Sequence, residues 1–417
     1  MHFRVNRRLR ILLVAVLIVI LYGLFWLERP TVTGRLKLPG GRVPPQVSIG
    51  SSHGMILAPD GSLWTWGGED SGWPVLGLGA TNFTAILRRI GSETNWVCVS
   101  AGQDHNLALK SDGTIWAWGA NYDFQLGDGS QTTRNSPVHS VPGNDWAQVV
   151  AGFVSSYALK KDGTLWAWGL NNFGQLGIGS WANSPTAVQV GSATNWVKIR
   201  VGGVSAGGIQ SDGSLWIWGG SPKLGNTVPQ NAENLLVPTR FSPDNNWVDL
   251  SVAFNIWLAI KSDGTLWAWG RNAQVFTDGS ASSGDAPKQI GTNTDWQACT
   301  SSGGGFYHVL RKRDGTFWVM DAPDHRSLRL RPVGLPKDVA SFRAGGGAIA
   351  VVTPDCEVWT CGTDLGRHEW KDRFLKSLAE RCWRFGWKVQ WGQNSNPIIR
   401  DKPWQLRNID PNNSAAK

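Results

Sequence analysis

Short stretches of alternating apolar and polar residues dominate the middle of the chain. One begins at residues 106–110 with the sequence NLALK, and residues 115–118 follow with the sequence IWAW. Alternation with a period of two predicts half-buried β-strands. The intervening Ser-Asp-Gly-Thr predicts a tight hairpin turn, because glycine adopts a positive φ without steric cost. Side chains two apart lie on one face of a strand, so Trp116 and Trp118 are expected on the same side.

This hairpin recurs along the chain with a nearly constant spacing. The aspartates that open its turns are Asp60, Asp112, Asp162, Asp212, Asp263, Asp314 and Asp355. The steps between them are 52, 50, 50, 51, 51 and 41 residues. A β-unit of this length has apolar faces that only a neighbouring unit can cover, so such units stack radially. The repeats predict an all-β, seven-bladed β-propeller.

Two further landmarks accompany the turn. An Asn-Trp or Asp-Trp pair begins 17 residues before four of the turns, as at Asn95 and Asp145. The sequences FQLGDG at 124–129 and GQLGIG at 174–179 follow two of the turns. With the Asp-Gly-Thr-Leu-Trp-Ala-Trp-Gly core, these elements closely resemble the regulator of chromosome condensation repeat over residues 43–362. The sixth and seventh copies depart from the pattern, because Met320 and Cys361 replace the second tryptophan.

The resemblance implies a binding protein rather than one fixed activity. The eukaryotic founder of this family exchanges guanine nucleotides on a small GTPase and binds chromatin. A secreted bacterial inhibitor of β-lactamases has a propeller of similar repeats and binds its target through loops on one face. The chain looks like a bacterial-like, membrane-anchored member of the family, which argues against the founder's role and favours an extracytoplasmic protein partner.

The N-terminus has the pattern of a signal anchor. Arg4, Arg7, Arg8 and Arg10 precede an uninterrupted apolar run at residues 11–27. A run of 17 residues is at the short end of what crosses a bilayer as a helix. The positive flank predicts a cytoplasmic N-terminus and an extracytoplasmic propeller, either periplasmic or at the cell surface. A cleaved signal peptide is the alternative, but no A-x-A-like site follows the run.

These patterns divide the chain into five segments. Residues 1–10 form a basic cytoplasmic tail, 11–27 a transmembrane signal anchor, 28–42 a linker and 43–362 the propeller. Residues 363–417 form a C-terminal helix and closing segment. Trp370, Phe374, Leu375, Leu378 and Cys382 recur there at helical spacing, which predicts a helix packed on the propeller or, alternatively, resting on anionic lipid. Residues 387–391, with the sequence WKVQW, could complete the last blade.

The net charge of +9 does not indicate nucleic-acid binding. The excess lies in residues 1–29 and 363–417, whereas residues 30–362 carry 24 acidic and 24 basic side chains. A neutral body lacks the charge that phosphate-backbone binding needs, so no nucleic acid partner is expected. The five cysteines show neither a Cys-x-x-Cys motif nor regular spacing, so no metal site is predicted. No cofactor is expected either, because no phosphate- or dinucleotide-binding motif occurs.

Candidate catalytic residues are explained by the repeat itself. Residues 203–207 fit the Gly-x-Ser-x-Gly hydrolase pattern around Ser205. However, Ser205 lies seven residues before Asp212, in register with His53 and His105. Both histidines are expected to be hydrogen-bonded within their own hairpins, and we predict no catalytic activity.

A candidate binding rim comes from the loop that precedes the second strand of each repeat. Equivalent loops of a radial array lie on one face, and this loop carries Gln103, Phe153, Phe254, Phe306 and Tyr307. Exposed aromatic side chains are favoured binding anchors. The alternative is that these rings fold inward and plug the channel. Function is therefore predicted as membrane-tethered protein interaction with an unidentified ligand. The alternatives are polysaccharide binding through exposed tryptophans and an enzyme that uses the central channel.

Overall fold

The computed structural model describes residues 38–68, 72–80, 83–220, 235–253, 256–270, 287–301, 308–321, 329–362 and 404–405. The chain divides into two compact units, Met1–Arg35 and Leu36–Lys417, and all described residues belong to the second. In these ranges the secondary structure consists of strands and turns, without an α-helix. Accordingly, the described part offers no helical segment that could cross a bilayer. The predicted anchor at 11–27 and the predicted C-terminal helix lie outside the described residues.

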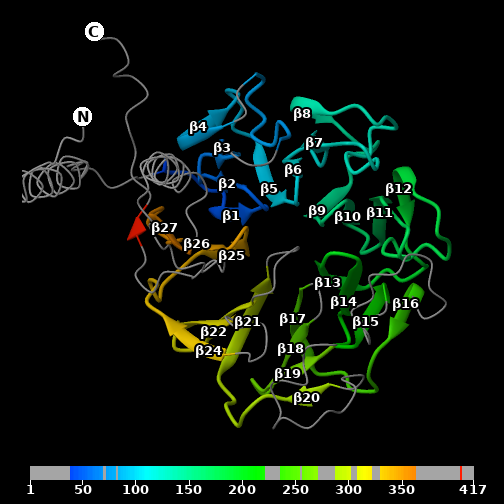
Figure 1. Cartoon of the computed structure of the whole chain (residues 1–417), viewed down its shortest axis with the longest axis vertical. Helices are drawn as coiled ribbons and strands as arrows, with labels where there is room; N and C mark the ends of the chain where they lie inside the picture. Colours follow the sequence, from blue (N-terminus) through cyan, green and yellow to red (C-terminus); the bar gives the residue numbers. More distant parts are fainter. Residues whose placement is uncertain are drawn as a thin grey trace, which may run out of the picture. The chain divides into compact units, whose positions relative to one another are not determined.

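The described strands form seven four-stranded antiparallel sheets, or blades, around a common centre (Figure 1). Blade 1 contains β1 (Gln46–Ile49), β2 (His53–Leu57), β3 (Leu63–Gly67) and β4 (Thr84–Ile90), and blade 2 contains β5 (Trp96–Ala101), β6 (His105–Lys110), β7 (Ile115–Gly119) and β8 (Arg134–His139). Blade 3 contains β9 (Trp146–Ala151), β10 (Ser155–Lys160), β11 (Leu165–Gly169) and β12 (Ser184–Gln189), and blade 4 contains β13 (Trp196–Val201), β14 (Ser205–Gln210), β15 (Leu215–Gly219) and β16 (Leu235–Arg240).

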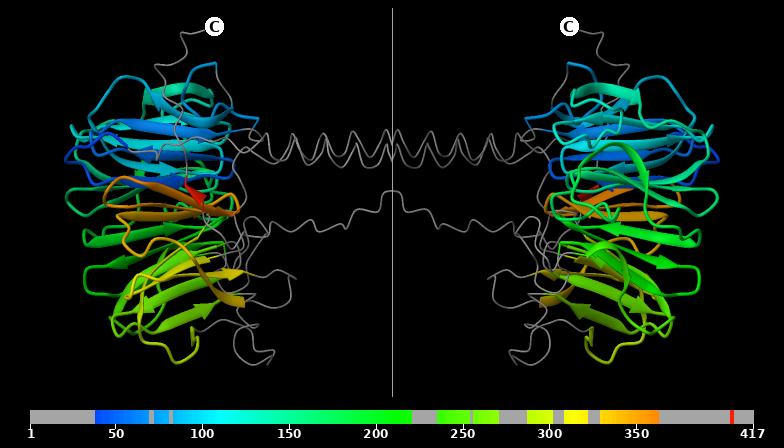
Figure 2. Two further views of the ribbon diagram at one scale, coloured as in Figure 1. Left: turned by 90° about the vertical axis from the view of Figure 1, so that its left-hand side faces the viewer. Right: turned by 90° about the vertical axis from the view of Figure 1, so that its right-hand side faces the viewer.

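Blade 5 contains β17 (Trp247–Val252), β18 (Trp257–Lys261), β19 (Leu266–Trp269) and β20 (Lys288–Gln289), and blade 6 contains β21 (Trp296–Ser301), β22 (His308–Lys312), β23 (Phe317–Asp321) and β24 (Arg329–Val333). Blade 7 contains β25 (Ser341–Gly345), β26 (Ala348–Val352), β27 (Val358–Gly362) and β28 (Trp404–Gln405). The first strand of each blade lies beside the first strands of its neighbours, so these seven strands surround the centre. The side views show strands of successive blades next to one another, seen from the edge of the ring (Figure 2). The predicted seven-bladed propeller is confirmed.

The Asp-Gly turn is held by a short relay of hydrogen bonds. In blade 2, the Asp112 carboxylate accepts from the backbone N–H of Thr114 at 2.9 Å and from its hydroxyl at 2.6 Å. The Thr114 hydroxyl in turn accepts from the indole N–H of Trp116 at 3.1 Å. Gly113 has a φ of 84°, and an added Cβ would lie 1.9 Å from the carbonyl oxygen of Asn144. The turn therefore requires glycine, both for its conformation and for its contact with the segment leading into blade 3.

Each of seven apolar clusters is shared by two adjacent blades, including the last and the first. Between blades 1 and 2, Trp118 is fully buried and Trp116 packs partly buried against the same cluster. Both tryptophans therefore lie on one face of β7, as predicted. The Trp116 ring also meets Trp96 edge-on, with 6.1 Å between ring centroids. The interface between blades, rather than the interior of one sheet, forms the core.

A buried or half-buried lysine lies against two tryptophan rings in several blades. The Lys110 ammonium is 3.6 Å from the Trp116 centroid and 4.8 Å from that of Trp96, and it pairs with Glu93 at 2.8 Å. Equivalent lysines with two ring contacts and a carboxylate partner are Lys160, Lys261 and Lys312. The ring faces and the carboxylate together compensate for the cost of burying the charge.

The loop after the third strand leads to the fourth strand of the same blade and packs against the next blade. The Asn121 side chain closes this loop by accepting from the Leu126 N–H at 3.0 Å and donating to the Ser130 carbonyl at 2.8 Å. The buried carbonyl of Gln125 accepts from the Ser156 hydroxyl and the Trp168 indole N–H of blade 3. The Gln-Leu-Gly landmark therefore serves blade-to-blade packing.

The last two blades keep the architecture despite their altered sequence. Met320 and Cys361 are both buried and occupy interface clusters where the other copies have their second tryptophan. In blade 7 the fourth strand is β28, which pairs Trp404 with Thr360 and Gln405 with Trp359. We expected residues 387–391 to complete this blade. They lie outside the described residues, and β28 occupies the fourth-strand position instead.

Candidate functional site

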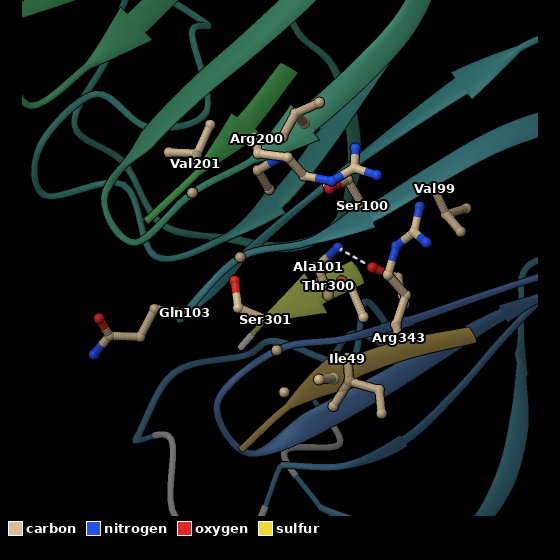
Figure 3. Close-up of a pocket in the computed structure, with 18 of the residues that line it drawn as sticks. Ile49, Val99, Ser100, Ala101, Gln103, Arg200, Val201, Thr300, Ser301 and Arg343 are labelled. Carbon is tan, nitrogen blue, oxygen red and sulfur yellow. Dashed lines mark hydrogen bonds between the residues drawn. The ribbon is translucent and has the colours of Figure 1, made fainter. Parts of the chain in front are cut away.

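The described residues enclose a cavity of about 570 Å³ at the centre of the ring. Its walls come from the inner strands β1, β5, β9, β13, β21 and β25 and from the loops that follow several of them (Figure 3). A volume of this size falls in the range of small-molecule sites. The lining contains arginine, glutamine and hydroxyl side chains among small apolar ones, and its polar groups come from several blades.

Because the blades share one strand register, equivalent side chains form layers around the cavity. One layer contains Ser48, Ser100, Val150, Arg200, Ser251, Thr300 and Arg343, each opposite the residue of the second strand that lies five positions before the turn aspartate. The next layer contains Gln46, Cys98, Gln148, Lys198, Asp249, Ala298 and Ser341. The first layer carries two positive charges and no negative one.

Hydrogen bonds between neighbouring inner strands fix this wall. The Ser48 hydroxyl accepts from the Ala101 N–H at 2.8 Å, and the Ser100 hydroxyl accepts from the Ala151 N–H at 2.9 Å. On the far side, the Ser301 hydroxyl donates to the Val252 carbonyl at 2.7 Å. Bonds that span about one repeat in sequence hold each side chain relative to the next blade, so the wall is a preorganised surface.

The nearly fully buried Asp249 pairs with Arg200, one of the two arginines that line the cavity. One of its oxygens lies 2.9 Å from the Lys198 ammonium and 3.4 Å from the Arg200 guanidinium. Its other oxygen accepts from the Cys299 N–H at 3.0 Å. Asp249 therefore links three successive blades, and its single negative charge is shared by two cations.

Arg343 lies three blades away from Arg200 around the ring, and both extend toward the cavity (Figure 3). It donates to its neighbour's carbonyl, that of Phe342, at 2.9 Å. Cavity solvent reaches the side chain, but the surrounding strands still desolvate its guanidinium. Desolvation first, and repulsion from Arg200 second, lower the pKa of Arg343 to about 10. Arg343 therefore stays charged at neutral pH.

Part of the predicted rim lies at the mouth of this cavity. Gln103 and Phe153 both line it, and the two loops touch where the Gln103 N–H donates to the Gly152 carbonyl at 3.2 Å. Both side chains are partly exposed. Phe254, Phe306 and Tyr307 lie outside the described residues. Two of the five rim residues are thus adjacent, and the rim as a binding surface stays a prediction.

The residues that resembled catalytic groups have structural contacts. Ser205 is buried at the start of β14, and its hydroxyl donates to the Gly220 carbonyl at 3.0 Å. We expected His53 and His105 to bond within their own hairpins, and this was wrong. His53 bonds Asn106 at 2.7 Å and His105 bonds Ser156 at 2.9 Å, in each case in the next blade. The second strands of adjacent blades face one another, which brings these groups together across the interface.

Our sequence reasoning missed Arg200 and Arg343, although a signal was available. Each lies 12 residues before the aspartate of its turn, where Ser48, Ser100 and Val150 stand in other copies. Counting back from every Asp-Gly would have placed two arginines in one layer of the ring.

Comparison with known proteins supports the repeat assignment. A family model described as the regulator of chromosome condensation (RCC1) repeat matches residues 112–159 and 162–205. A second model of the same description matches residues 96–125 and 146–175.

Curated relatives match over short stretches. Protein RCC2 of Homo sapiens is 39% identical over 98 residues, which is 23% of this chain and 18% of that protein. The ultraviolet-B receptor UVR8 of Arabidopsis thaliana is 31% identical over 111 residues, which is 27% of this chain and 25% of the receptor. The matched part therefore spans at most a quarter of the length of these two relatives.

Solved structures match over most of the chain. Human WBSCR16 superposes with a TM-score of 0.60 at 18% identity, covering 72% of this chain and 89% of that one. Prp20p of Saccharomyces cerevisiae superposes with a TM-score of 0.61 at 17% identity, covering 72% and 80%. At such identities, the likeness shows the fold alone.

Proposed function

We propose that this chain, whose propeller is built from regulator of chromosome condensation repeats, is a protein-interaction module tethered to a membrane and displayed outside the cytoplasm. The yeast structures of the same fold are described with Gsp1p and histones in one case and with Kap60 in the other. These names describe partners of the yeast protein. They support protein binding as the general use of such a ring, whereas the partner of this chain is a different, unidentified protein.

The observation that carries the proposal is the adjacency of Gln103 and Phe153 at the mouth of the cavity. Both project from loops between the first and second strands of their blades, and both are partly exposed. An aromatic ring and an amide on two touching loops offer a partner a large apolar area and directional hydrogen bonds at small entropic cost. The two side chains therefore suit an anchor point for a protein surface.

The tether is proposed from the N-terminal sequence. An arginine-rich flank before the apolar run at 11–27 is retained in the cytoplasm, and the segment after the run is exported. A neutral propeller body is compatible with this placement and gives no reason to expect nucleic acid.

Neither alternative gains support from the described residues. Binding of polysaccharide would be favoured by a row of exposed tryptophans, but every tryptophan whose burial the structure describes, between Trp64 and Trp359, is buried or half-buried. An enzyme using the channel would be favoured by convergent carboxylates, but the residues lining the described cavity include arginines and no aspartate or glutamate.

Affinity capture with the full chain tests the interaction. Wild type should retain a partner protein from the native envelope fraction, and Phe153→Ser should lose it while keeping its melting temperature. Val188→Ser, at an exposed apolar position of β12, is the matched control and should retain the partner. A lower melting temperature for Phe153→Ser would mean that the ring plugs the channel. Retention of both stability and partner would contradict either role.

A pair of reporter fusions at Lys417 tests the tether. A phosphatase that is active only after export should be active there, and a reporter that is active only in the cytoplasm should be silent. The reverse pattern would overturn the proposed orientation.

A further inference from the structure

Two of the side chains that line the central cavity are positively charged, and the other lining side chains are neutral. Arg200 and Arg343 line its walls, and Lys198 lies two residues before Arg200 in the same inner strand. Among the described residues, Asp249 is the carboxylate that contacts Lys198 and Arg200. The Asp249 carboxylate pairs with Lys198 and Arg200 and accepts a hydrogen bond from the backbone N–H of Cys299. No described carboxylate pairs with Arg343, and the cations of one pocket are left incompletely neutralised.

The two arginines are placed to act together. They occupy the same layer on blades 4 and 7, and three blades is the largest separation that a ring of seven allows. Their side chains therefore approach the cavity from nearly opposite walls. Each repels the other, and this repulsion contributes to the lowered pKa of Arg343. A ligand with negative charge at both ends would relieve it.

The remaining groups of the layer suit the same ligand. The Ser48 and Ser100 hydroxyls accept from backbone N–H groups of the next blade, so each retains its own proton for donation. Guanidinium groups donate two parallel hydrogen bonds to carboxylate or phosphate oxygens, and such charge-assisted pairs are the strongest that side chains form. The two arginines and the two serines of the layer thus offer hydrogen-bond donors to the cavity.

We propose that the cavity binds a small ligand bearing at least two negative charges on phosphate or carboxylate oxygens, held between Arg200 and Arg343. The site is separate from the proposed protein interaction, because it uses the inner wall and not the rim loops. The fixed hydrogen bonds of the wall keep the donors in place before the ligand enters, so little order has to be gained on binding.

Titration calorimetry of the full chain in detergent tests this site, with pyrophosphate and citrate as separate probes. At least one probe should bind with one site per chain, and the stronger of the two identifies phosphate or carboxylate as the preferred chemistry. Arg343→Gln should weaken that binding about tenfold or more, since a charge-assisted hydrogen bond and one ligand contact are lost. Arg134→Gln is the control, because Arg134 pairs with Asp128 and does not line the cavity.

Two readouts separate a binding role from a structural one. Without ligand, Arg343→Gln should melt at the same temperature as wild type or higher, because a repulsive charge has been removed. Arg343→Lys keeps the positive charge but lacks the planar guanidinium that donates two parallel hydrogen bonds. This variant should therefore bind the probe severalfold more weakly than wild type. If neither probe binds at millimolar concentration, or if both Arg343 variants bind as tightly as wild type, the proposal is wrong.

Discussion

The backbone carbonyl of Gln125, in the loop between β7 and β8 of blade 2, accepts a 3.0 Å hydrogen bond from the indole N–H of Trp168 in blade 3. One blade earlier, the carbonyl of Val75 accepts from Trp118 at the same distance. A loop that looks like a surface connection therefore satisfies the polar atom of a fully buried ring. This pairing explains why Trp118 and Trp168 are tolerated at the centre of their interfaces.

Replacing Trp168 should separate its apolar and polar contributions. Trp168→Ala removes a fully buried ring from the interface between blades 2 and 3 and should lower the free energy of unfolding by about 3–5 kcal/mol. Trp168→Phe keeps most of the ring but leaves the Gln125 carbonyl with one donor fewer, so its cost should be about 1–3 kcal/mol. Urea unfolding monitored by circular dichroism measures both. Trp166→Ala, at a half-buried position, should cost less than Trp168→Ala, and the opposite order would contradict this account.

Removing the first member of the turn relay should also destabilise the ring. The Asp60 carboxylate accepts from the N–H and hydroxyl of Ser62, which is fully buried and accepts from Trp64. Asp60→Ala would leave two buried donors without their acceptor and should cost about 1–3 kcal/mol. Asp60→Asn keeps an acceptor oxygen and should cost less. Equal melting temperatures for wild type and Asp60→Ala would show that the relay does not stabilise the turn.

Three buried histidines should make stability depend on pH. Desolvation lowers the pKa of His53 to about 4 and those of His105 and His308 to about 3. In the unfolded chain these groups bind a proton near pH 6.5, whereas in the folded ring they stay neutral. Stability is therefore fully present above about pH 6.5 and is lost as the pH falls toward about 4, by about 1.4 kcal/mol per pH unit for each histidine.

Urea unfolding at several pH values in this window measures the slope. His105→Gln should remove about one third of it, since one of three equivalent groups is lost. His139→Gln, at an exposed position, should leave the slope unchanged. A stability that does not change between about pH 6.5 and about pH 4 would show that these histidines are not held in the neutral form.

Much of the fold was predictable because the same turn and strand motifs recur along the chain. The Asp-Gly turn predicts the hairpin, and the Trp-x-Trp strand predicts its apolar face. Seven copies of this unit predict a ring. The partners of His53 and His105 were not predictable in the same way. Periodicity places equivalent residues on equivalent strands, but it does not say which side chain of the next blade lies opposite.

The strand that closes blade 7 and the layer with the two arginines were not predicted from the sequence, for two different reasons. β28 has two residues and follows the third strand of its blade after a long interval, so neither its length nor its position carries a periodic signal. Arg200 and Arg343 each lie 12 residues before the aspartate of their turn. Taken alone, however, one arginine in a predicted strand looks like an ordinary surface residue. Their significance comes from the ring, which brings positions 143 residues apart to one cavity.

The apolar cluster shared by the last and the first blade has a consequence for how the domain loses structure. An open row of seven repeats would have six interfaces and two free ends, and a linear array frays from such ends. Closure adds a seventh interface, formed by residues such as Val47 and Ala350, without adding a blade. Any blade that detaches must then break contacts on both sides at once. The ring has no terminal repeat, and a single cooperative transition in calorimetry is the behaviour that this connectivity favours.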